Sequence, residues 1–262
     1  MTSTSSIKLA VFFAHVQEAT EQTGKPLQEI LQTIKEWGIS ALEFDYEVLK
    51  PQETFFHTLL EETGLEISSI YGFFDFGKQS VKSEDFNLID LAVRLGCKNV
   101  MAIPGFYSST NTSEREAEFC NMVAGMKELI SYGSSQGVQV LMEDFDDPSS
   151  PFCSLEGLHR LMREAPDIGC TFDTGNFIYD TCNGWDAFQI LSPYIKHVHF
   201  KDRMEDFSPA STGTGVMKIK EILNLLLENN YQGYISIEHF DAPDQLEYIR
   251  QSAKWIQSQL RN

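Results

Sequence analysis

Cysteine is scarce and unpatterned in this chain of 262 residues. The five cysteines are scattered, odd in number and nowhere spaced as C-x-x-C, the arrangement typical of zinc ribbons and dithiol redox sites. They are Cys97, Cys120, Cys153, Cys170 and Cys182. This usage argues against a disulfide framework and predicts free thiols in a reducing cytoplasm.

Basic residues are also few, 20 against 38 acidic ones, so the formal net charge is -18. Such a charge repels phosphate backbones and anionic membrane surfaces, and nucleic acid is not an expected partner. No apolar run has the length of a membrane span, and the N-terminal "MTSTSSIKLAVFF" lacks the basic region and long apolar stretch of a signal peptide. We expect a cytoplasmic protein without a membrane partner, with residues 1–6 as a disordered lead.

Short runs rich in β-branched and aromatic residues recur along the chain and predict eight strands. They are "KLAVFF" ending at Phe13, "SALEF" at Phe44, "EISSIY" at Tyr71, "KNVMAI" at Ile103, "VQVLME" at Glu143, "IGCTFD" at Asp173, "IKHVHF" at Phe200 and "GYISIE" at Glu238. Helical patterns such as "PLQEILQTIKEWG" and "IKEILNLLLENNYQG" separate them, most of them ending in a glycine that suits a C-terminal cap.

This strand-then-helix repeat predicts the α/β class and a (β/α)8 TIM barrel, formed as one domain over residues 1–262. A doubly wound open sheet is the alternative. That fold normally carries a glycine-rich phosphate loop after its first strand, and "FFAHVQEATEQTGK" is not one.

Four residues of metal-ligand type stand at the ends of four successive predicted strands: Glu143, Asp173, His199 and Glu238. Strand side chains alternate between faces, and in each strand the apolar residues on the other parity are expected to face the helices. The four polar side chains therefore point into the barrel, at the C-terminal mouth where barrel enzymes place their sites.

Three carboxylates packed together would raise one another's pKa values, because each disfavours the charge of the next. A divalent metal removes that conflict. Three carboxylates and one imidazole favour Mn²⁺, Mg²⁺ or Co²⁺, with Zn²⁺ also compatible. The sequence therefore predicts one metal held by Glu143, Asp173, His199 and Glu238.

The segments "VLMED", "CTFDTGN", "HVHFKDR" and "GVMKIKEILNLLLENNYQGYISIEH" make the chain similar to the sugar phosphate isomerase/epimerase superfamily. These xylose-isomerase-like TIM barrels include ketose 3-epimerases, inosose dehydratases and metal-dependent AP endonucleases. The resemblance implies that the same four residues bind one catalytic metal. It also implies that Glu143 and Glu238 flank the substrate carbon beside a carbonyl, one removing a proton and the other returning it.

One motif departs from that family. Many members have D-x-x-H after the sixth strand, whereas this chain has "DTGN", with Asn176 at the histidine position. Asparagine can bind a sugar hydroxyl but is a poor second metal ligand. An AP endonuclease would need further histidines on the third and fourth strands, which offer none.

Other polar residues near the mouth are expected to contact substrate. Lys201 and Arg203, with Lys218, can hold hydroxyls or a phosphate, and "TGTG" at 212–215 can donate backbone N–H groups; solvated cations and a plain glycine loop are the alternative. Glu43 faces inward by parity, either towards substrate or as a buried partner for a cation.

Both histidines in "IKHVHFKDR" point into the barrel by parity, so only their depth in the barrel can indicate which one is the metal ligand. His199 is expected to stand level with the other three ligands, and His197 one layer lower, beside Thr171 and Ser236, where it supports and orients them. Aromatic residues on strand ends and mouth loops are candidates for the wall of a sugar site: Phe12, Phe13, Phe73, Phe74 and Phe106.

These features predict a divalent-metal-dependent isomerase or epimerase that acts on a small sugar or polyol through a metal-stabilised enediolate. A dehydratase of the inosose type is one alternative, and a catalytically silent binding subunit of the same fold is another. The oligomeric state is left open, with a homo-oligomer as one option.

Overall fold

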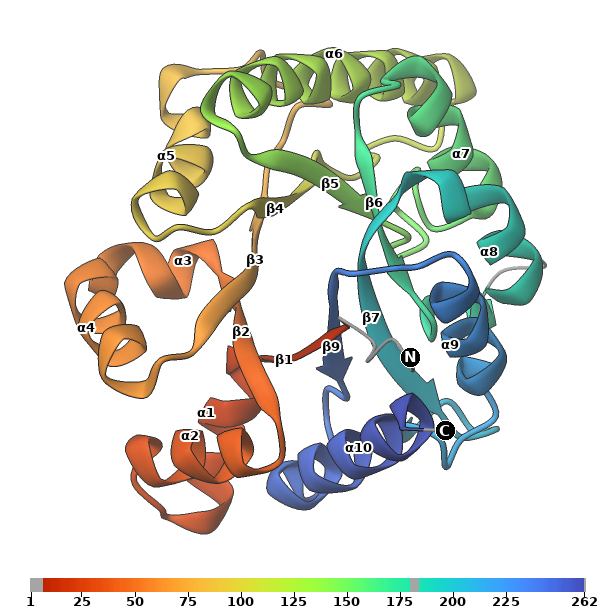
Figure 1. Ribbon diagram of the computed structural model, residues 1–262. Helices are drawn as coiled ribbons and strands as arrows, with labels where there is room; N and C mark the ends of the chain where they lie inside the picture. The colour runs from red at the N-terminus through yellow and green to blue at the C-terminus, as the bar shows by residue number, and fades with distance from the viewer. Residues whose placement is uncertain (1–6, 180–183, 262) are drawn as a thin grey trace.

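The computed structural model describes residues 7–179 and 184–261, and in it the predicted (β/α)8 barrel is confirmed. The expected lead at residues 1–6 and Cys182 lie outside the described residues, and the other four cysteines are free thiols. Eight strands pair in parallel around a closed cylinder, and the pairing of β6 with β7 completes the ring. Figure 1 looks down this barrel, with the strands at the centre and the helices around them.

The strands alternate with helices along the chain. The strands are β1 Lys8–Phe12, β2 Ile39–Asp45, β3 Glu66–Phe73, β4 Asn99–Ile103, β5 Gln139–Glu143, β6 Gly169–Asp173, β7 Ile195–Arg203, β8 Pro209–Ala210 and β9 Tyr234–Glu238. The helices are α1 Phe13–Thr23, α2 Leu27–Glu36, α3 Tyr46–Leu49, α4 Glu53–Thr63, α5 Asn87–Arg94, α6 Thr112–Gln136, α7 Leu155–Glu164, α8 Gly184–Leu191, α9 Ile219–Glu228 and α10 Gln245–Leu260, with 3-10 turns at Lys50–Gln52, Ser83–Phe86, Asn176–Tyr179 and Ser192–Tyr194. The short β8, which pairs antiparallel with the end of β7, was not predicted.

Glycine caps end several of the helices, as the sequence predicts. Gly137 follows α6 with a φ of 71°, and its N–H donates to the carbonyls of Gly133 and Ser134. A left-handed residue lets the chain reverse at once into β5, because it satisfies carbonyls that the helix leaves open.

The main apolar core lies between the barrel and its helices. The outward parity of β2, for example, buries Leu42 and Phe44 completely. Phe13 stacks on Phe44 at 4.7 Å and meets Phe56 edge-on at 5.0 Å, so it belongs to this core and not to the mouth. Phe74 likewise packs on Phe76. Both therefore differ from their expected place on the wall of the site.

A second, smaller apolar cluster fills one side of the barrel interior. It is formed by Met101, Ile103 and Leu141, with Tyr71, Phe106 and Phe145 packed against it. The opposite side of the interior is polar, because β6, β7 and β9 point Asp173, His199 and Glu238 inwards. The sequence thus gives the barrel an apolar side and a charged side.

No helix in the described parts of the chain is both long and apolar enough to cross a membrane.

Candidate metal centre

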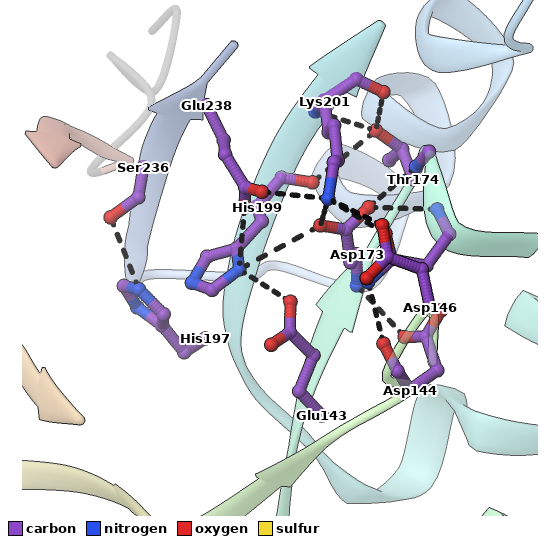
Figure 2. A network of polar contacts seen from close by, with 12 residues as sticks. Glu143, Asp144, Asp146, Asp173, Thr174, His197, His199, Lys201, Ser236 and Glu238 are labelled. Atoms are coloured by element: carbon purple, nitrogen blue, oxygen red, sulfur yellow. Dashed lines mark hydrogen bonds and ion pairs between the residues drawn. The ribbon is translucent and has the colours of Figure 1, made fainter. Parts of the chain in front are cut away.

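Four side chains meet at the C-terminal mouth of the barrel. Glu143 ends β5, Asp173 ends β6, His199 lies in β7 and Glu238 ends β9. One ligand atom from each lies within 4.8 Å of the others, and all four residues are buried. The structure therefore brings together the set that the sequence predicts, as Figure 2 shows.

The Nδ1 atom of His199 is the point on which the carboxylates converge. It lies 2.9 Å from Oε1 of Glu143, 3.1 Å from Oε2 of Glu238 and 3.9 Å from Oδ2 of Asp173. The strand register, however, does not pair all four residues with one another. Glu143 pairs with Thr171, Asp173 with His199, and Glu238 with Lys201.

The four side chains nevertheless converge on one site, although their register positions differ. Parallel strands in a barrel are tilted relative to its axis, so hydrogen-bonded neighbours on adjacent strands lie at different heights along that axis. The tilt carries side chains from different register positions to one height.

The two carboxylate oxygens of Asp173 have different roles, one in the turn after β6 and the other at the site. Its Oδ1 atom accepts hydrogen bonds from the N–H groups of Gly175, at 2.6 Å, and Asn176, at 3.0 Å, which shapes the turn after β6. Its Oδ2 atom is buried without a hydrogen-bond partner. A buried acceptor without a donor costs free energy unless something else compensates it, and a cation bound here would do so.

Glycine is required in this turn for steric reasons. A Cβ atom on Gly175 would stand 2.7 Å from the carbonyl oxygen of Lys201, closer than real contacts allow. The turn therefore packs directly against the backbone of β7, which fixes Asp173 relative to His199.

The carboxylates differ in their electrostatic surroundings. Burial raises the pKa of Glu143 and raises that of Asp173 well above its usual value. Burial acts the same way on Glu238, but the nearby ammonium of Lys201 and His199 hold its pKa well below its usual value. For two of the three acids, burial thus outweighs the nearby charges of His199 and Lys201, and a further cation would favour their ionised forms.

The donor set fits a hard divalent cation, because it offers carboxylate oxygens from three residues and one imidazole nitrogen. We therefore treat these four residues as a candidate metal centre.

Lys201 bridges this centre to its surroundings. Its Nζ atom lies 2.8 Å from Oε1 of Glu238, 2.8 Å from Oδ1 of Asn176 and 3.5 Å from Oδ2 of Asp146. Asn176 in turn donates from Nδ2 to the carbonyl of Asp144 at 2.6 Å. Asn176 therefore holds the lysine side chain against Glu238.

Glu43 lies behind the imidazole and not on a substrate-facing wall. Its Oε1 atom is 3.2 Å from Nε2 of His199, and its Oε2 atom is 2.8 Å from Nε2 of His197 and 2.5 Å from the Ser236 hydroxyl. Of the two roles expected for Glu43, these contacts match the buried partner of a cation. His197 lies beside Thr171 and Ser236, as expected.

A cavity of about 580 Å³ opens over the candidate metal centre. Among the residues expected to contact substrate, Asn176, Lys201 and Arg203 line it. The guanidinium of Arg203 lies 3.1 Å from Oδ2 of Asp146, so this cation is already paired with an acid at the mouth.

The loop "TGTG" does not offer its amides to a ligand. The N–H groups of Gly213 and Gly215 donate to the Asp202 carboxylate at 2.8 and 2.9 Å, and that of Met217 donates to it at 3.2 Å. The amides expected as phosphate donors are thus occupied by a carboxylate of the protein. Asp202 has the parity of the helix-facing residues, which is the signal that could have revealed this role.

Sequence reasoning also missed several residues that line the cavity. His239, whose parity in the chain is that of the helix-facing residues, is at the cavity wall, where its ring stacks on that of His15 at 4.8 Å. Tyr71, Phe145 and Phe240 also line the cavity and were not expected to. Phe12 and Phe73 line it as expected. Their positions one or two residues beyond strand ends were the available signal for Phe145 and Phe240.

The model of one protein family, described as xylose isomerase-like TIM barrel, matches residues 31–259. The chain belongs to this family. Xylose isomerase-like barrels share the closed parallel sheet described above, and the match covers every strand from β2 to β9.

Two curated relatives are inosose dehydratases. That of Clostridium tetani is 33% identical over 110 residues, which is 33% of this chain and 36% of the relative. That of Clostridium perfringens strain ATCC 13124 is 25% identical over 167 residues, 54% of each chain. The chain thus spans between a third and a little over half of the length of these relatives.

Two solved structures share the fold along the whole chain. The probable 3-DHS dehydratase AsbF of Bacillus anthracis has a TM-score of 0.76 and 18% identity, with 96% of this chain and 99% of that chain covered. The 3-keto-D-glucoside 4-epimerase YcjR of E. coli has a TM-score of 0.72 and 18% identity, with 97% and 99% covered. At this identity the likeness extends to the xylose isomerase-like fold alone.

Proposed function

We propose that this protein is a divalent-metal-dependent enzyme that moves a proton at a carbon beside a carbonyl group of a sugar or polyol, as an isomerase or epimerase. The observation that carries the proposal is the convergence of Glu143, Asp173, His199 and Glu238 on one point below an open cavity. A set of three acids and one imidazole at the mouth of a barrel supports chemistry rather than stability.

The metal would be held by these four residues, with Mn²⁺, Mg²⁺ or Co²⁺ favoured by the oxygen-rich donor set and Zn²⁺ compatible with it. When bound, the cation would act as a Lewis acid that acidifies the C–H next to a coordinated carbonyl.

Glu143 and Glu238 are the candidate acid and base. Both line the cavity, and they come from β5 and β9, which β6 and β7 separate in the barrel. A substrate seated between them has one carboxylate on each side. One carboxylate can remove a proton from carbon, and the other can return one from the opposite face.

Lys201, Asn176 and Arg203 are proposed to bind substrate hydroxyl groups. Lys201 presents an ammonium to the cavity, and Asn176 fixes it from behind. Glu43, His197 and Ser236 are proposed to support the imidazole of His199 and not to touch substrate.

A dehydratase is the second candidate, because the two curated relatives are inosose dehydratases and AsbF is a probable 3-DHS dehydratase. Such an enzyme begins with the same proton abstraction and differs in the next step, in which a hydroxyl group on the adjacent carbon leaves as water. The epimerase YcjR supports the first candidate in the same way.

The test is to incubate metal-loaded protein in D₂O with a panel of ketoses and with a cyclic inosose, and to follow substrates by NMR. Deuterium gain at carbon with inversion or carbonyl migration supports an isomerase or epimerase. Loss of water supports a dehydratase. Glu143→Gln and Glu238→Gln should each abolish exchange, while Glu118→Gln, a change at a buried glutamate of α6 that is not among the residues lining the cavity, should leave it intact. Full exchange in Glu238→Gln would remove Glu238 from the acid–base pair.

A further inference from the structure

The cavity over the candidate metal centre has two unlike halves. One half is an aromatic arc, which we define as Phe12, Tyr71, Phe73, Phe145 and Phe240. Below it, Met101 and Ile103 continue the apolar surface into the barrel.

The rings of the aromatic arc touch one another in sequence. Phe240 meets Phe12 at 5.6 Å between ring centroids, Phe12 meets Tyr71 at 5.8 Å, Tyr71 meets Phe73 at 6.4 Å, and Phe73 meets Phe145 at 6.0 Å. These separations lie within the range of favourable ring pairs. The arc is therefore one continuous surface built by residues from β1, β3 and the segments after β5 and β9.

Two rings of the arc remain open to solvent. Phe73 is 52% exposed and Phe240 39% exposed, although each packs against another ring of the arc. Contiguous exposed apolar surface is uncommon on soluble proteins unless it binds something. Here it forms the wall of a cavity that also leads to the candidate metal centre, so its occupant and the substrate share one space.

The polar half of the cavity is equally distinct. Of the charged residues described as lining the cavity, Asp45 alone does not belong to or follow β5, β7 or β9. A fully hydroxylated ligand that filled the whole cavity would turn hydroxyl groups towards the arc, where Tyr71 is the one ring that carries a hydroxyl and the Asp45 carboxylate is its polar neighbour. Hydroxyls that lose water without gaining a partner oppose binding.

We propose that the substrate of this cavity is a keto sugar or keto polyol that carries a ring-sized apolar group, of the kind found as the aglycone of an aryl glycoside, and that this group packs on the aromatic arc. This inference rests on the proposed function for the polar end, where the polyol part would reach Glu143, Glu238 and Lys201. A volume of about 580 Å³ is typical of sites for ligands larger than one small sugar, which agrees with a two-part substrate.

The test is calorimetric binding of matched glycoside pairs to the metal-loaded protein. The pairs are methyl and phenyl β-glycosides of glucose, galactose and xylose, which differ only in the group expected to meet the arc. For at least one sugar the phenyl member should bind about tenfold more tightly or better, the gain expected of one well-packed ring. Equal affinities within every pair, or no binding of any phenyl member, would overturn the inference.

Variants of the arc separate ring packing from other effects. Phe73→Ser should remove most of the preference for the phenyl member and leave the affinity for the methyl member unchanged, and Phe73→Tyr should retain the preference. Since Phe73 is half exposed, serine there does not threaten folding. Phe55→Ser is the matched control, because Phe55 is 46% exposed on α4, outside the cavity. A phenyl preference that survives in Phe73→Ser and in Phe145→Ala would also overturn the inference.

Failure of the proposed function gives a different result. If the four buried residues hold no metal, calorimetric titration with Mn²⁺ or Co²⁺ and the deuterium-exchange test both fail, while the phenyl preference and its loss in Phe73→Ser are still measurable. If the arc inference alone fails, metal binding and exchange persist and the members of each pair bind equally.

Discussion

Glu43 lies against the Nε2 edge of the His199 imidazole at 3.2 Å, on the side opposite to the Nδ1 atom that faces the candidate metal centre. A carboxylate in this position keeps a proton on Nε2 and leaves the lone pair of Nδ1 directed at a metal. The pair is itself supported, since Ser236 and His197 hold the other carboxylate oxygen of Glu43.

Glu43→Gln should therefore weaken metal binding by roughly 10–100-fold, the usual cost of losing a hydrogen-bond partner behind a ligating histidine. The glutamine amide cannot accept hydrogen bonds from all of Ser236, His197 and His199 as the carboxylate does, because only its oxygen accepts and its nitrogen is a donor. Titration with Co²⁺, followed by its visible absorption, measures the affinity. Glu118→Gln, a buried glutamate that accepts from Ser108, provides the control. Unchanged affinity in Glu43→Gln would show that the imidazole needs no such support.

Metal binding should release a proton. Burial alone would lower the pKa of His199, but the carboxylates of Glu43 and Glu143 raise it well above its usual value. A raised pKa favours the protonated imidazole, and a metal at Nδ1 has to displace that proton. Because protons compete with the metal for Nδ1, metal affinity should fall as the pH falls and rise as the pH increases. Calorimetry in buffers of different ionisation enthalpy counts the proton. A pH-independent affinity across the neutral range would contradict this prediction.

Metal should also stabilise the fold, because the four ligands come from four strands that are adjacent only in the folded barrel. At a free metal concentration of one hundred times Kd the gain is about 2.7 kcal/mol, or roughly 5–10 °C in Tm for a chain of this size. Asp173→Asn should lose this shift and keep the fold, since an amide oxygen can still accept from Gly175 and Asn176. Thermal unfolding with and without Mn²⁺ measures both. An equal shift in Asp173→Asn would exclude Asp173 as a ligand.

Parity of the strands was enough to predict which residues face the barrel interior. Leu42 and Phe44 are buried towards the helices while Glu43 points inwards, as the alternation requires. The strand register could not be predicted in the same way. It depends on strand tilt and on local register shifts, such as the one between Leu42 and Glu43, and neither has a signature in the order of residues.

Contacts between segments far apart in the chain could not be predicted from the sequence either. Glu43 and His197 are 154 positions apart, and Gly213 meets Asp202 because the loop after β7 folds back over the strand end. The local sequence "HVHFKDR" does not indicate whether its aspartate, Asp202, binds a metal, a substrate or backbone amides. The closed barrel decides this, because it determines which loop each strand end meets.

The loop after β7 should depend on Asp202. Its carboxylate accepts three loop amides while almost fully buried, so Asp202→Ala leaves those N–H groups without their partner. We expect a loss of about 3 kcal/mol in the free energy of unfolding and faster proteolysis within residues 203–217, since hydrogen bonds to a charged acceptor contribute more than neutral ones. Limited proteolysis and chemical denaturation measure these effects. Asp206→Ala is the control, because Asp206 is exposed and bonds to Ser208 alone among the contacts described. Equal protease resistance in both variants would contradict the role of Asp202.

Asn176 should affect the chemistry through Lys201 and through substrate binding in the cavity, and not through the metal. It accepts from the Lys201 ammonium at 2.8 Å and is itself held by the carbonyl of Asp144. Asn176→Ala removes the acceptor, and loss of a hydrogen bond to a charged group corresponds to a decrease of roughly 10–100-fold in kcat/KM. Metal affinity, measured by the Co²⁺ titration, should stay within about twofold of the wild type, because Asn176 contributes no atom to the candidate metal centre. Asn176→His separates two readings of the position: if the asparagine serves mainly to hold Lys201, histidine restores little activity. Recovery of full activity with histidine would mean that this position contacts substrate in its own right.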